Sequence, residues 1–245
     1  FKNVSFTYPH TGIQAIQNFN LTVKPGEKVA VIGRTGSGKS TLAQLLIRMY
    51  DPQEGAVMLD GMDLRTLKLE DLRTQISYVP QDVFLFSDTI TNNIRFGTPE
   101  ANEEAVRRAA RQASVEKDIL GFPEGFNTVV GERGVTLSGG QKQRISIARG
   151  LIKDPNLLVF DDCLSAVDAR TEKEIIGNLY AFLKDKTAII ITHRIFALFE
   201  FDKIIVLDDG KIVETGTHDE LLSLNGYYAE LYARQQSGDD ESVIE

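Results

Sequence analysis

The chain has 245 residues, of which 42% are hydrophobic and 25% are charged, a composition typical of globular proteins with a buried core. Its formal net charge of −8 has the wrong sign for a protein that binds nucleic-acid backbone or an anionic bilayer surface, so we expect no nucleic-acid partner. The apolar runs are too short to span a bilayer and the single Cys163 excludes an intrachain disulfide, which predicts a cytosolic segment without direct bilayer insertion.

The N-terminal residues predict antiparallel strands. Apolar side chains occupy every second position in residues 4–8 and again in residues 19–23, which lie before a Pro-Gly turn. Because this alternation is already under way at Phe1, we expect the sequence to be part of a longer protein.

Residues 28–32 form an apolar run that Gly33 ends, and apolar residues at helical spacing follow in 42–49. These features predict a strand, a glycine-rich loop and a helix, the opening of an α/β fold.

The middle of the sequence predicts helices followed by buried strands. Thr98-Pro99 is typical of a helix start, and we predict a helix from there to about Arg111 within a mostly helical stretch over residues 85–155. Residues 157–160 and 187–191 are continuous apolar runs, which indicate strands covered on both faces in a largely parallel sheet.

Two Asp-Gly pairs predict hairpins or tight turns, and the C-terminal part predicts a last helix. Asp-Gly pairs at 60–61 and 209–210 are typical of tight turns between short strands. Residues 217–220 match a capping box and predict a last helix that ends near Gly226. We expect one domain over residues 1–236 and an acidic, disordered tail over residues 237–245.

Residues 33–40 satisfy the pattern G-x-x-x-x-G-K-[ST] between a predicted strand and a predicted helix. Such a loop turns backbone N–H groups toward phosphate oxygens at a helix N-terminus, with the lysine charge near the β- and γ-phosphates. The alternative is a glycine-rich turn that only joins strand to helix. The pattern predicts a nucleotide site made of Gly33, Arg34, Thr35, Gly36, Ser37, Gly38, Lys39, Ser40 and Thr41, with the Ser40 hydroxyl on Mg²⁺.

A second motif lies at Leu137, Ser138, Gly139, Gly140 and Gln141. Ser138 and Gln141 form a capping-box pattern, and the two glycines leave the helix N-terminus without side-chain cover, which suits it to hold an anion. It could also be a capped helix and nothing more. Asp161 and Asp162 follow the buried run at 157–160, which places a carboxylate for Mg²⁺ at the end of a strand.

In order and spacing these motifs resemble the ATP-binding domain of ABC transporters, over residues 1 to about 236. The resemblance implies a P-loop NTPase core with a mainly parallel sheet, an N-terminal antiparallel β subdomain and an inserted helical subdomain, with ATP and Mg²⁺ as ligands. It implies that Tyr8 stacks on adenine, that Gln81 reaches Mg²⁺ and the attacking water, and that His193 contacts the γ-phosphate. Residues 137–141 would bind the partner's ATP. Residues 165–168, with Asp168, would cross the dimer interface, and Lys39 and Asp162 would act in catalysis.

Two positions depart from the pattern of this family. Residues 128–134 are similar to the segment that marks exporter-type domains, but Val129 stands where that segment usually has glutamate. Asp162 stands where the family typically has the glutamate that polarises the attacking water. The shorter side chain withdraws the carboxylate by about 1.5 Å, the length of one C–C bond. We therefore expect ATP to bind while hydrolysis is slowed. Alternatively, an adjustment of the backbone restores the reach. Cys163 is interpreted as a small buried packing residue.

The resemblance implies the cytosolic ATPase domain of an exporter at the cytoplasmic face of the cell (inner) membrane. Its expected partners are transmembrane domains and a second ATP-binding domain. The altered Asp162 favours a heterodimer, in which this second domain belongs to a different protein. Two other functions stay open. One is a regulatory ATP-binding module that barely hydrolyses ATP. The other is a soluble ABC-type ATPase, which usually carries tandem domains or a coiled-coil insertion that this sequence does not show.

Overall fold

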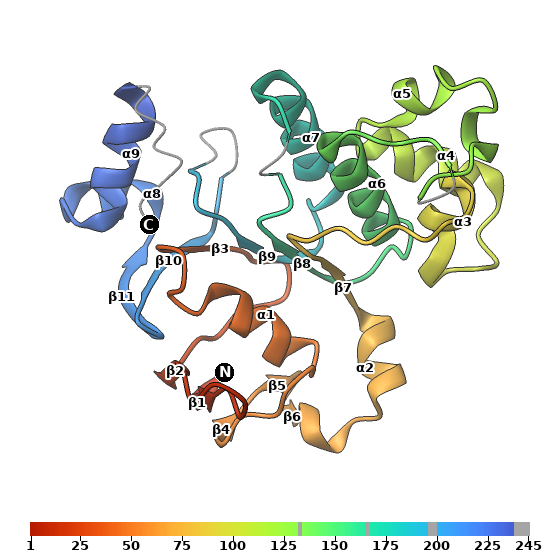
Figure 1. The fold of residues 1–245 in the computed structure, drawn as a ribbon. Coiled ribbons are helices and arrows are strands. Elements are labelled where there is room, and N and C mark those ends of the chain that lie inside the picture. The colour runs from red at the N-terminus through yellow and green to blue at the C-terminus, as the bar shows by residue number, and fades with distance from the viewer. Residues whose placement is uncertain (132–133, 165–166, 196–199, 238–245) are drawn as a thin grey trace. The chain divides into compact units, whose positions relative to one another are not determined.

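The structure is a computed structural model that describes residues 1–131, 134–164, 167–195 and 200–237. The chain forms two compact units: unit 1 consists of Phe1–Arg73 and Thr187–Glu245, and unit 2 of Thr74–Lys186. Figure 1 labels the helices and strands of both. Each unit is described by itself below.

Unit 1 begins with a small antiparallel sheet in the order β2-β1-β4. Strand β1 (Lys2–Thr7) pairs with β2 (Gln14–Phe19) on one side and with β4 (Glu54–Ala56) on the other, which confirms the predicted N-terminal antiparallel strands. The strand predicted over residues 19–23 is wrong, because β2 ends at Phe19. Beyond the pair of Val4 and Phe19 the ladder is interrupted, because Asn3 has a φ of 49° and donates its N–H to the side-chain Oδ1 of Asn20 at 2.9 Å.

The larger sheet of unit 1 has the order β11-β10-β3-β9. Strand β3 (Lys28–Ile32) lies between β9 (Thr187–Ile191) and β10 (Lys203–Asp208) and is parallel to both. Strand β11 (Lys211–Gly216) is antiparallel to β10 across the predicted turn at 209–210. The apolar runs that predicted buried parallel strands here are confirmed.

The remaining elements of unit 1 are short helices and a hairpin. Helix α1 (Lys39–Leu46) follows the loop after β3. The predicted turn at 60–61 joins β5 (Met58–Leu59) to β6 (Met62–Asp63). The 3₁₀ helix η1 (Leu64–Thr66) and α2 (Leu69–Gln75) follow, and the boundary between the units falls within α2.

The C-terminal helices correct one prediction. Helix α8 (His218–Ser223) starts at the expected capping box of Thr217 and Glu220, but the chain does not end its helices near Gly226. A further helix, α9 (Tyr227–Ser237), follows. Its first N–H groups are capped by the carboxylate of Glu214 on β11, a distant residue that no local sequence signal reveals.

Unit 2 combines two parallel strands, β7 (Ile76–Val79) and β8 (Leu157–Asp161), with helices. Figure 1 shows α3, α4, α5 and α6 grouped together within this unit. The predicted start of a helix at Thr98 is wrong, because the helix begins at Glu103. Asn102 caps this helix, α4, by accepting the Ala105 N–H at 2.9 Å. The helical elements are α3 (Ile90–Ile94), η2 (Arg95–Gly97), α4 (Glu103–Gln112), α5 (Glu116–Leu120), η3 (Gly125–Asn127), α6 (Gly139–Leu151) and α7 (Ala169–Phe182).

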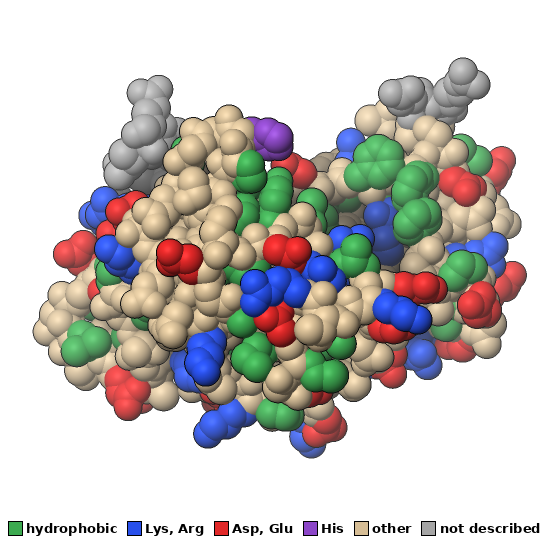
Figure 2. All heavy atoms as spheres, turned by 90° about the horizontal axis from the view of Figure 1, so that it is seen from below, with side chains coloured by type: hydrophobic (Ala, Val, Ile, Leu, Met, Phe, Trp, Pro, Cys, Tyr) green, Lys and Arg blue, Asp and Glu red, His purple; other side chains and the backbone are tan. Residues whose placement is uncertain are grey.

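The predicted mixed α/β class is confirmed by these elements. In unit 1, β3 is parallel to both β9 and β10, and β11 is antiparallel to β10; in unit 2, β7 and β8 are parallel to each other. On the face drawn in Figure 2, Lys and Arg side chains are interspersed with Asp and Glu side chains.

Candidate functional site

The loop between β3 and α1 forms a tight cradle in unit 1. Gly36 and Gly38 have φ of 81° and 101°, in the left-handed region that side chains rarely allow. A Cβ on Gly38 would collide with the carbonyl oxygen of Ala15. Because Gly38 caps α1 without a side chain, the first N–H groups of this helix are left for another acceptor, which suits an anion.

Lys39 folds back over this loop. Its Nζ donates to the carbonyl oxygens of Gly33 at 2.8 Å and Arg34 at 2.7 Å, which holds the ammonium group at the start of the loop. Ser37 is buried, and its Oγ has no hydrogen-bond partner among the described residues. A buried hydroxyl without a partner costs about 1–3 kcal/mol, so the loop fits a ligand that carries acceptor oxygens.

Tyr8 follows β1 and lies against the helix that starts at this loop. Its hydroxyl shares a hydrogen bond with Thr41 Oγ1 at 2.9 Å and donates to Gln44 Oε1 at 2.8 Å. The rings of Phe6 and Tyr50 contact the ring of Tyr8 edge to face, with centroids 5.0 and 5.5 Å away. The predicted aromatic residue and the predicted phosphate loop therefore lie close together within unit 1.

His193 lies after β9, at a sharp bend in unit 1, and its side chain is exposed. The residues on both sides of it are fixed by hydrogen bonds. The buried Thr192 donates its N–H to Val31 O at 3.1 Å, and Ile195 donates its N–H to Gln235 Oε1 at 2.9 Å. The sequence gives no signal for Gln235, which lies on the unpredicted helix α9.

The predicted carboxylates lie at the end of β8 in unit 2. Asp161 is the last residue of the strand, is only 3% exposed, and accepts a hydrogen bond from the Tyr78 hydroxyl at 3.1 Å. Tyr78 is not among the residues predicted for the site. The pairing of β7 with β8 brings it there, since Tyr78 lies opposite Val159.

Asp162 has a φ of 45°, in the left-handed region. Aspartate and asparagine enter this region more readily than other residues with side chains, because their short polar groups can hydrogen-bond locally. The conformation therefore suits aspartate at this position better than glutamate. The following residue, Cys163, is buried as predicted, and this burial, together with the neighbouring carboxylates, raises the pKa of its thiol.

The predicted signature turn starts α6 in unit 2, and its capping box is complete. Ser138 Oγ accepts the Gln141 N–H at 3.2 Å, and Gln141 Oε1 accepts the Ser138 N–H at 3.0 Å. Leu137 is buried, and Gly139 and Gly140 form the first turn without side-chain cover. The predicted cap is confirmed.

Asp118 on α5 supports this turn, although sequence analysis missed it. Its carboxylate accepts from Gln141 Nε2 at 3.1 Å and from Arg144 Nη1 at 2.8 Å. Burial disfavours the charged form of Asp118, but the hydrogen bonds from Arg144 and Gln141 outweigh this and lower the pKa of its carboxyl.

Two further predicted residues lie on the surface of unit 2. Gln81 is exposed and comes two residues after the end of β7. Asp168 caps α7 by accepting the N–H groups of Arg170 at 3.1 Å and Thr171 at 3.0 Å, and these bonds, that of Thr171 first, lower the pKa of its carboxyl. Residues 165–166 of the predicted interface loop lie outside the described residues.

Both units contain groups of the kind that bind Mg²⁺ together with phosphate. Mg²⁺ is usually held by one or two protein carboxylates, waters and substrate phosphates, not by a complete protein cage. Ser40 offers a hydroxyl, Gln81 an amide oxygen and Asp161 a carboxylate. In the described ranges no group of three or more His, Cys, Asp or Glu side chains is placed to hold a metal by itself.

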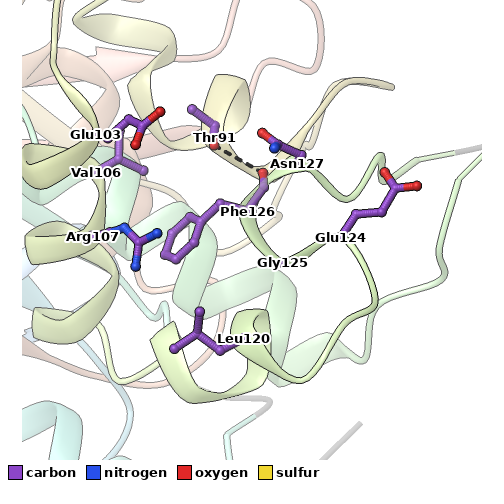
Figure 3. Close-up of a pocket in the computed structure, with 9 residues that line it drawn as sticks. All are labelled: Thr91, Glu103, Val106, Arg107, Leu120, Glu124, Gly125, Phe126 and Asn127. Atoms are coloured by element: carbon purple, nitrogen blue, oxygen red, sulfur yellow. Dashed lines mark hydrogen bonds between the residues drawn. The ribbon is translucent and has the colours of Figure 1, made fainter.

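Unit 2 also contains a hollow of about 190 Å³ that none of the predicted site residues lines. Figure 3 shows it among α3, α4, α5 and η3. The Arg107 guanidinium covers the ring of Phe126, 5.3 Å from its centroid, and Thr91 donates to the Phe126 carbonyl oxygen at 3.0 Å.

Within the described residues, no helix has both the length and the apolar character needed to cross a membrane.

Comparison with known proteins identifies the family. The ABC transporter family matches residues 16–165. The chain is 49% identical over 236 residues to a "probable multidrug resistance ABC transporter ATP-binding/permease protein" of Bacillus subtilis, with 96% of the chain and 40% of that protein covered. It is 48% identical over 239 residues to the ATP-dependent lipid A-core flippase of Alkalilimnicola ehrlichii, covering 97% of the chain and 41% of the flippase.

Among solved structures, a bacterial Atm1-family ABC exporter with ATP bound matches with a TM-score of 0.92 and 43% identity, over 96% of this chain and 41% of the exporter. The chain therefore spans about 40% of the length of these three proteins. The residues matched include the loop over residues 33–41, the turn at residues 137–141, and Asp161 and Asp162 at the end of β8. The chain belongs to the ABC transporter family, and it is the nucleotide-binding domain of that family.

Proposed function

We propose that this chain is the ATP-binding and ATP-hydrolysing domain that powers export by an ABC transporter. The observation that carries the proposal is the loop over residues 33–41, where the Lys39 ammonium lies across the loop and the glycine-capped helix α1 offers its N–H groups. The names of the similar proteins, which include a flippase and an exporter, support the direction of transport.

In this proposal the triphosphate binds to the backbone N–H groups of Gly36–Thr41, and Lys39 neutralises the β- and γ-phosphates. The adenine ring stacks on Tyr8. Ser40, Gln81 and Asp161 would hold Mg²⁺, which would supply positive charge beside the phosphates. The buried position of Asp161 and the exposure of Gln81 are compatible with these roles.

Hydrolysis transfers the γ-phosphoryl group to water. The oxygen of the water attacks the γ-phosphorus, the bond to the bridging oxygen breaks, and ADP and phosphate leave. Asp162 orients the water and accepts its proton, His193 contacts the γ-phosphate, and Lys39 stabilises the charge on the departing oxygens. Orientation and charge stabilisation carry most of the rate enhancement in such reactions.

A complete site requires a second ATP-binding domain. We propose that residues 137–141 bind the ATP of a partner domain, that Asp168 lies at the interface, and that binding of ATP closes the pair. Closure would move the attached transmembrane domains at the cytoplasmic face of the cell membrane, and release of the products would reset them. The intact capping box of Ser138 and Gln141 supports this role.

The signature turn and Asp162 of this chain serve two different ATP sites. The intact signature completes the partner's site, while the shortened Asp162 serves the chain's own ATP. A homodimer would have two slow sites, whereas a heterodimer with a glutamate-bearing partner would have one fast and one slow site. We therefore propose a heterodimer. The second candidate function is a regulatory module that holds ATP and barely hydrolyses it, and Asp162 is the observation that favours it.

The test is to purify the full-length protein alone and together with its candidate partner, and to measure phosphate release and transport. We expect the pair to hydrolyse ATP and to transport, and the protein alone to be much slower. Full activity of the protein alone would contradict the heterodimer. A second measurement disables the partner's site and follows single-turnover phosphate release by the pair. An unchanged rate would contradict the regulatory module, because the chain's own site would then account for the hydrolysis.

A further inference from the structure

Helix α9 lies outside the stretch that matches the family, and it is firmly fixed within unit 1. The carboxylate of Glu214 accepts the N–H groups of Tyr227 at 2.6 Å and Tyr228 at 3.2 Å at the start of the helix. Tyr228 is 1% exposed, and its hydroxyl shares a hydrogen bond with His218 Nδ1 at 2.7 Å. The N-terminal end of α9 is therefore held by both β11 and α8.

The same helix packs on the strand that leads to the phosphate loop. Tyr228 belongs to a buried cluster with Ala30 and Ile32 of β3, and Tyr227, Leu231 and Ile195 pack against that cluster. Because β3 ends at the loop, α9 lies over the part of the sheet from which the loop emerges.

The first contact of α9 with the site is to the loop itself. The Arg34 guanidinium lies over the ring of Tyr227, 5.5 Å from its centroid, which is a cation–π contact. The carbonyl oxygen of Arg34 accepts from Lys39 Nζ at 2.7 Å and from the Ser37 N–H at 3.2 Å. Tyr227 therefore restrains a residue whose backbone is bonded to the lysine of the loop.

The second contact is to the segment that carries His193. Gln235 Oε1 accepts the Ile195 N–H at 2.9 Å, two residues beyond His193. On the other side of His193, the Thr192 N–H is bonded to Val31 O at 3.1 Å. The exposed histidine thus lies in a short segment held at both ends, and one of the two holds comes from α9.

We propose that α9 is a positioning helix for the nucleotide site of this chain, in which Tyr227 restrains the phosphate loop through Arg34 and Gln235 restrains the segment of His193. The proposal rests on the proposed ATPase function and deepens it. Tyr227 and Gln235 are eight residues apart, about 12 Å along the helix axis, so one rigid element joins the two parts. Any movement that displaces α9 would alter both.

The two contacts have different kinetic consequences. The loop binds the triphosphate in the ground state, so the loss of the Tyr227 ring raises the KM for ATP. His193 acts on the γ-phosphate during transfer, so the loss of the Gln235 acceptor lowers kcat and leaves the KM nearly unchanged. A purely structural role for α9 would instead lower the yield or stability without this split.

The experiment compares five variants of the full-length protein. Each variant is assembled with a partner in which the partner's own ATP site is disabled. Gln235→Leu removes the acceptor, Gln235→Glu keeps one, and Gln236→Leu alters an exposed neighbour as a control. Tyr227→Leu removes the ring, and Tyr227→Phe keeps it. Steady-state kinetics gives kcat and KM for ATP, and hydrogen exchange measured by mass spectrometry reports the amide of Ile195.

We expect Gln235→Leu to lower kcat about tenfold and to speed exchange at Ile195, while Gln235→Glu and Gln236→Leu resemble the parent. We expect Tyr227→Leu to raise the KM about threefold and Tyr227→Phe to keep it. The inference is overturned if the parent hydrolyses ATP and Gln235→Leu changes neither kcat nor exchange, or if Gln236→Leu has the same effect. A parent without hydrolysis at this site overturns the proposed function itself.

Discussion

The side chain of Gln141 connects α5 to the start of α6, because its Nε2 donates to Asp118 Oδ1 at 3.1 Å while its Oε1 accepts the Ser138 N–H at 3.0 Å. Both ends of the amide are therefore fixed. Arg144 donates to the other oxygen of Asp118 at 2.8 Å, which holds the carboxylate in place. The turn that we propose contacts the partner's ATP is thus supported by a carboxylate outside the motif.

This arrangement predicts a pH-dependent contribution of Asp118 to stability. Its pKa is lowered in the folded state, so the charged carboxylate stabilises the fold above the unfolded pKa of about 3.9, and this stabilisation is lost as the pH falls through the folded pKa. The free energies of unfolding of the parent and Asp118→Asn, measured in urea between about pH 3 and pH 7, should differ by a constant amount above about pH 5.

Below that range the difference should shrink, because the parent carboxyl becomes protonated and neutral like the asparagine. Asp185→Asn, at an exposed position, is the control and should show little difference at any pH. A difference between parent and Asp118→Asn that does not change with pH would contradict the assignment of the charged hydrogen bonds.

The residues that the sequence predicted well are those whose signal is local. The phosphate loop and the Ser138–Gln141 box each lie within a few consecutive residues, so pattern and spacing were sufficient to locate them. Strand β8, which ends at Asp161, was predicted for the same reason, because its residues form a continuous apolar run.

The supporting residues could not be predicted, because their partners are distant in the sequence. Asp118 is 23 residues from Gln141, Tyr78 is 83 residues from Asp161, and Gln235 is 40 residues from Ile195. Helix α9 was missed because its cap comes from Glu214 on another element. Only the folded chain brings these groups together.

The substitution of a longer carboxylate tests the role of Asp162. In a dimer whose other site is disabled, Asp162→Glu should speed hydrolysis, by up to about a hundredfold, because a misplacement of about 1 Å can cost that much in rate. The left-handed conformation at this position opposes part of the gain, since glutamate enters it less readily than aspartate.

Asp162→Asn should slow the remaining hydrolysis, and neither variant should change ATP affinity much, since the side chain acts on the water and not on bound ATP. Single-turnover phosphate release measures the rate, and nucleotide titration measures affinity. If Asp162→Glu is no faster than the parent, the short carboxylate does not limit the reaction.

Tyr8 allows its ring and its hydroxyl to be tested separately. Stacking of a base on an aromatic ring is worth about 1–3 kcal/mol, so Tyr8→Leu should weaken ATP binding about fivefold or more. Tyr8→Phe keeps the ring, loses only the hydrogen bonds to Thr41 and Gln44, and should bind ATP with an affinity close to that of the parent. Titration with tripolyphosphate, which has no base, is the internal control. Equal loss of ATP and tripolyphosphate affinity in Tyr8→Leu would show that the ring supports the loop and does not stack on adenine.

In the proposed function, the loop between β3 and α1 binds the triphosphate of ATP. Calorimetric titration of ATP·Mg²⁺ into the parent, Lys39→Ala and Lys68→Ala tests it most directly, because Lys39 lies across the loop while Lys68 is an exposed lysine of unit 1 outside it. We expect Lys68→Ala to bind like the parent and Lys39→Ala to lose most of the affinity. An unchanged dissociation constant in Lys39→Ala would show that the lysine of this loop does not bind the triphosphate.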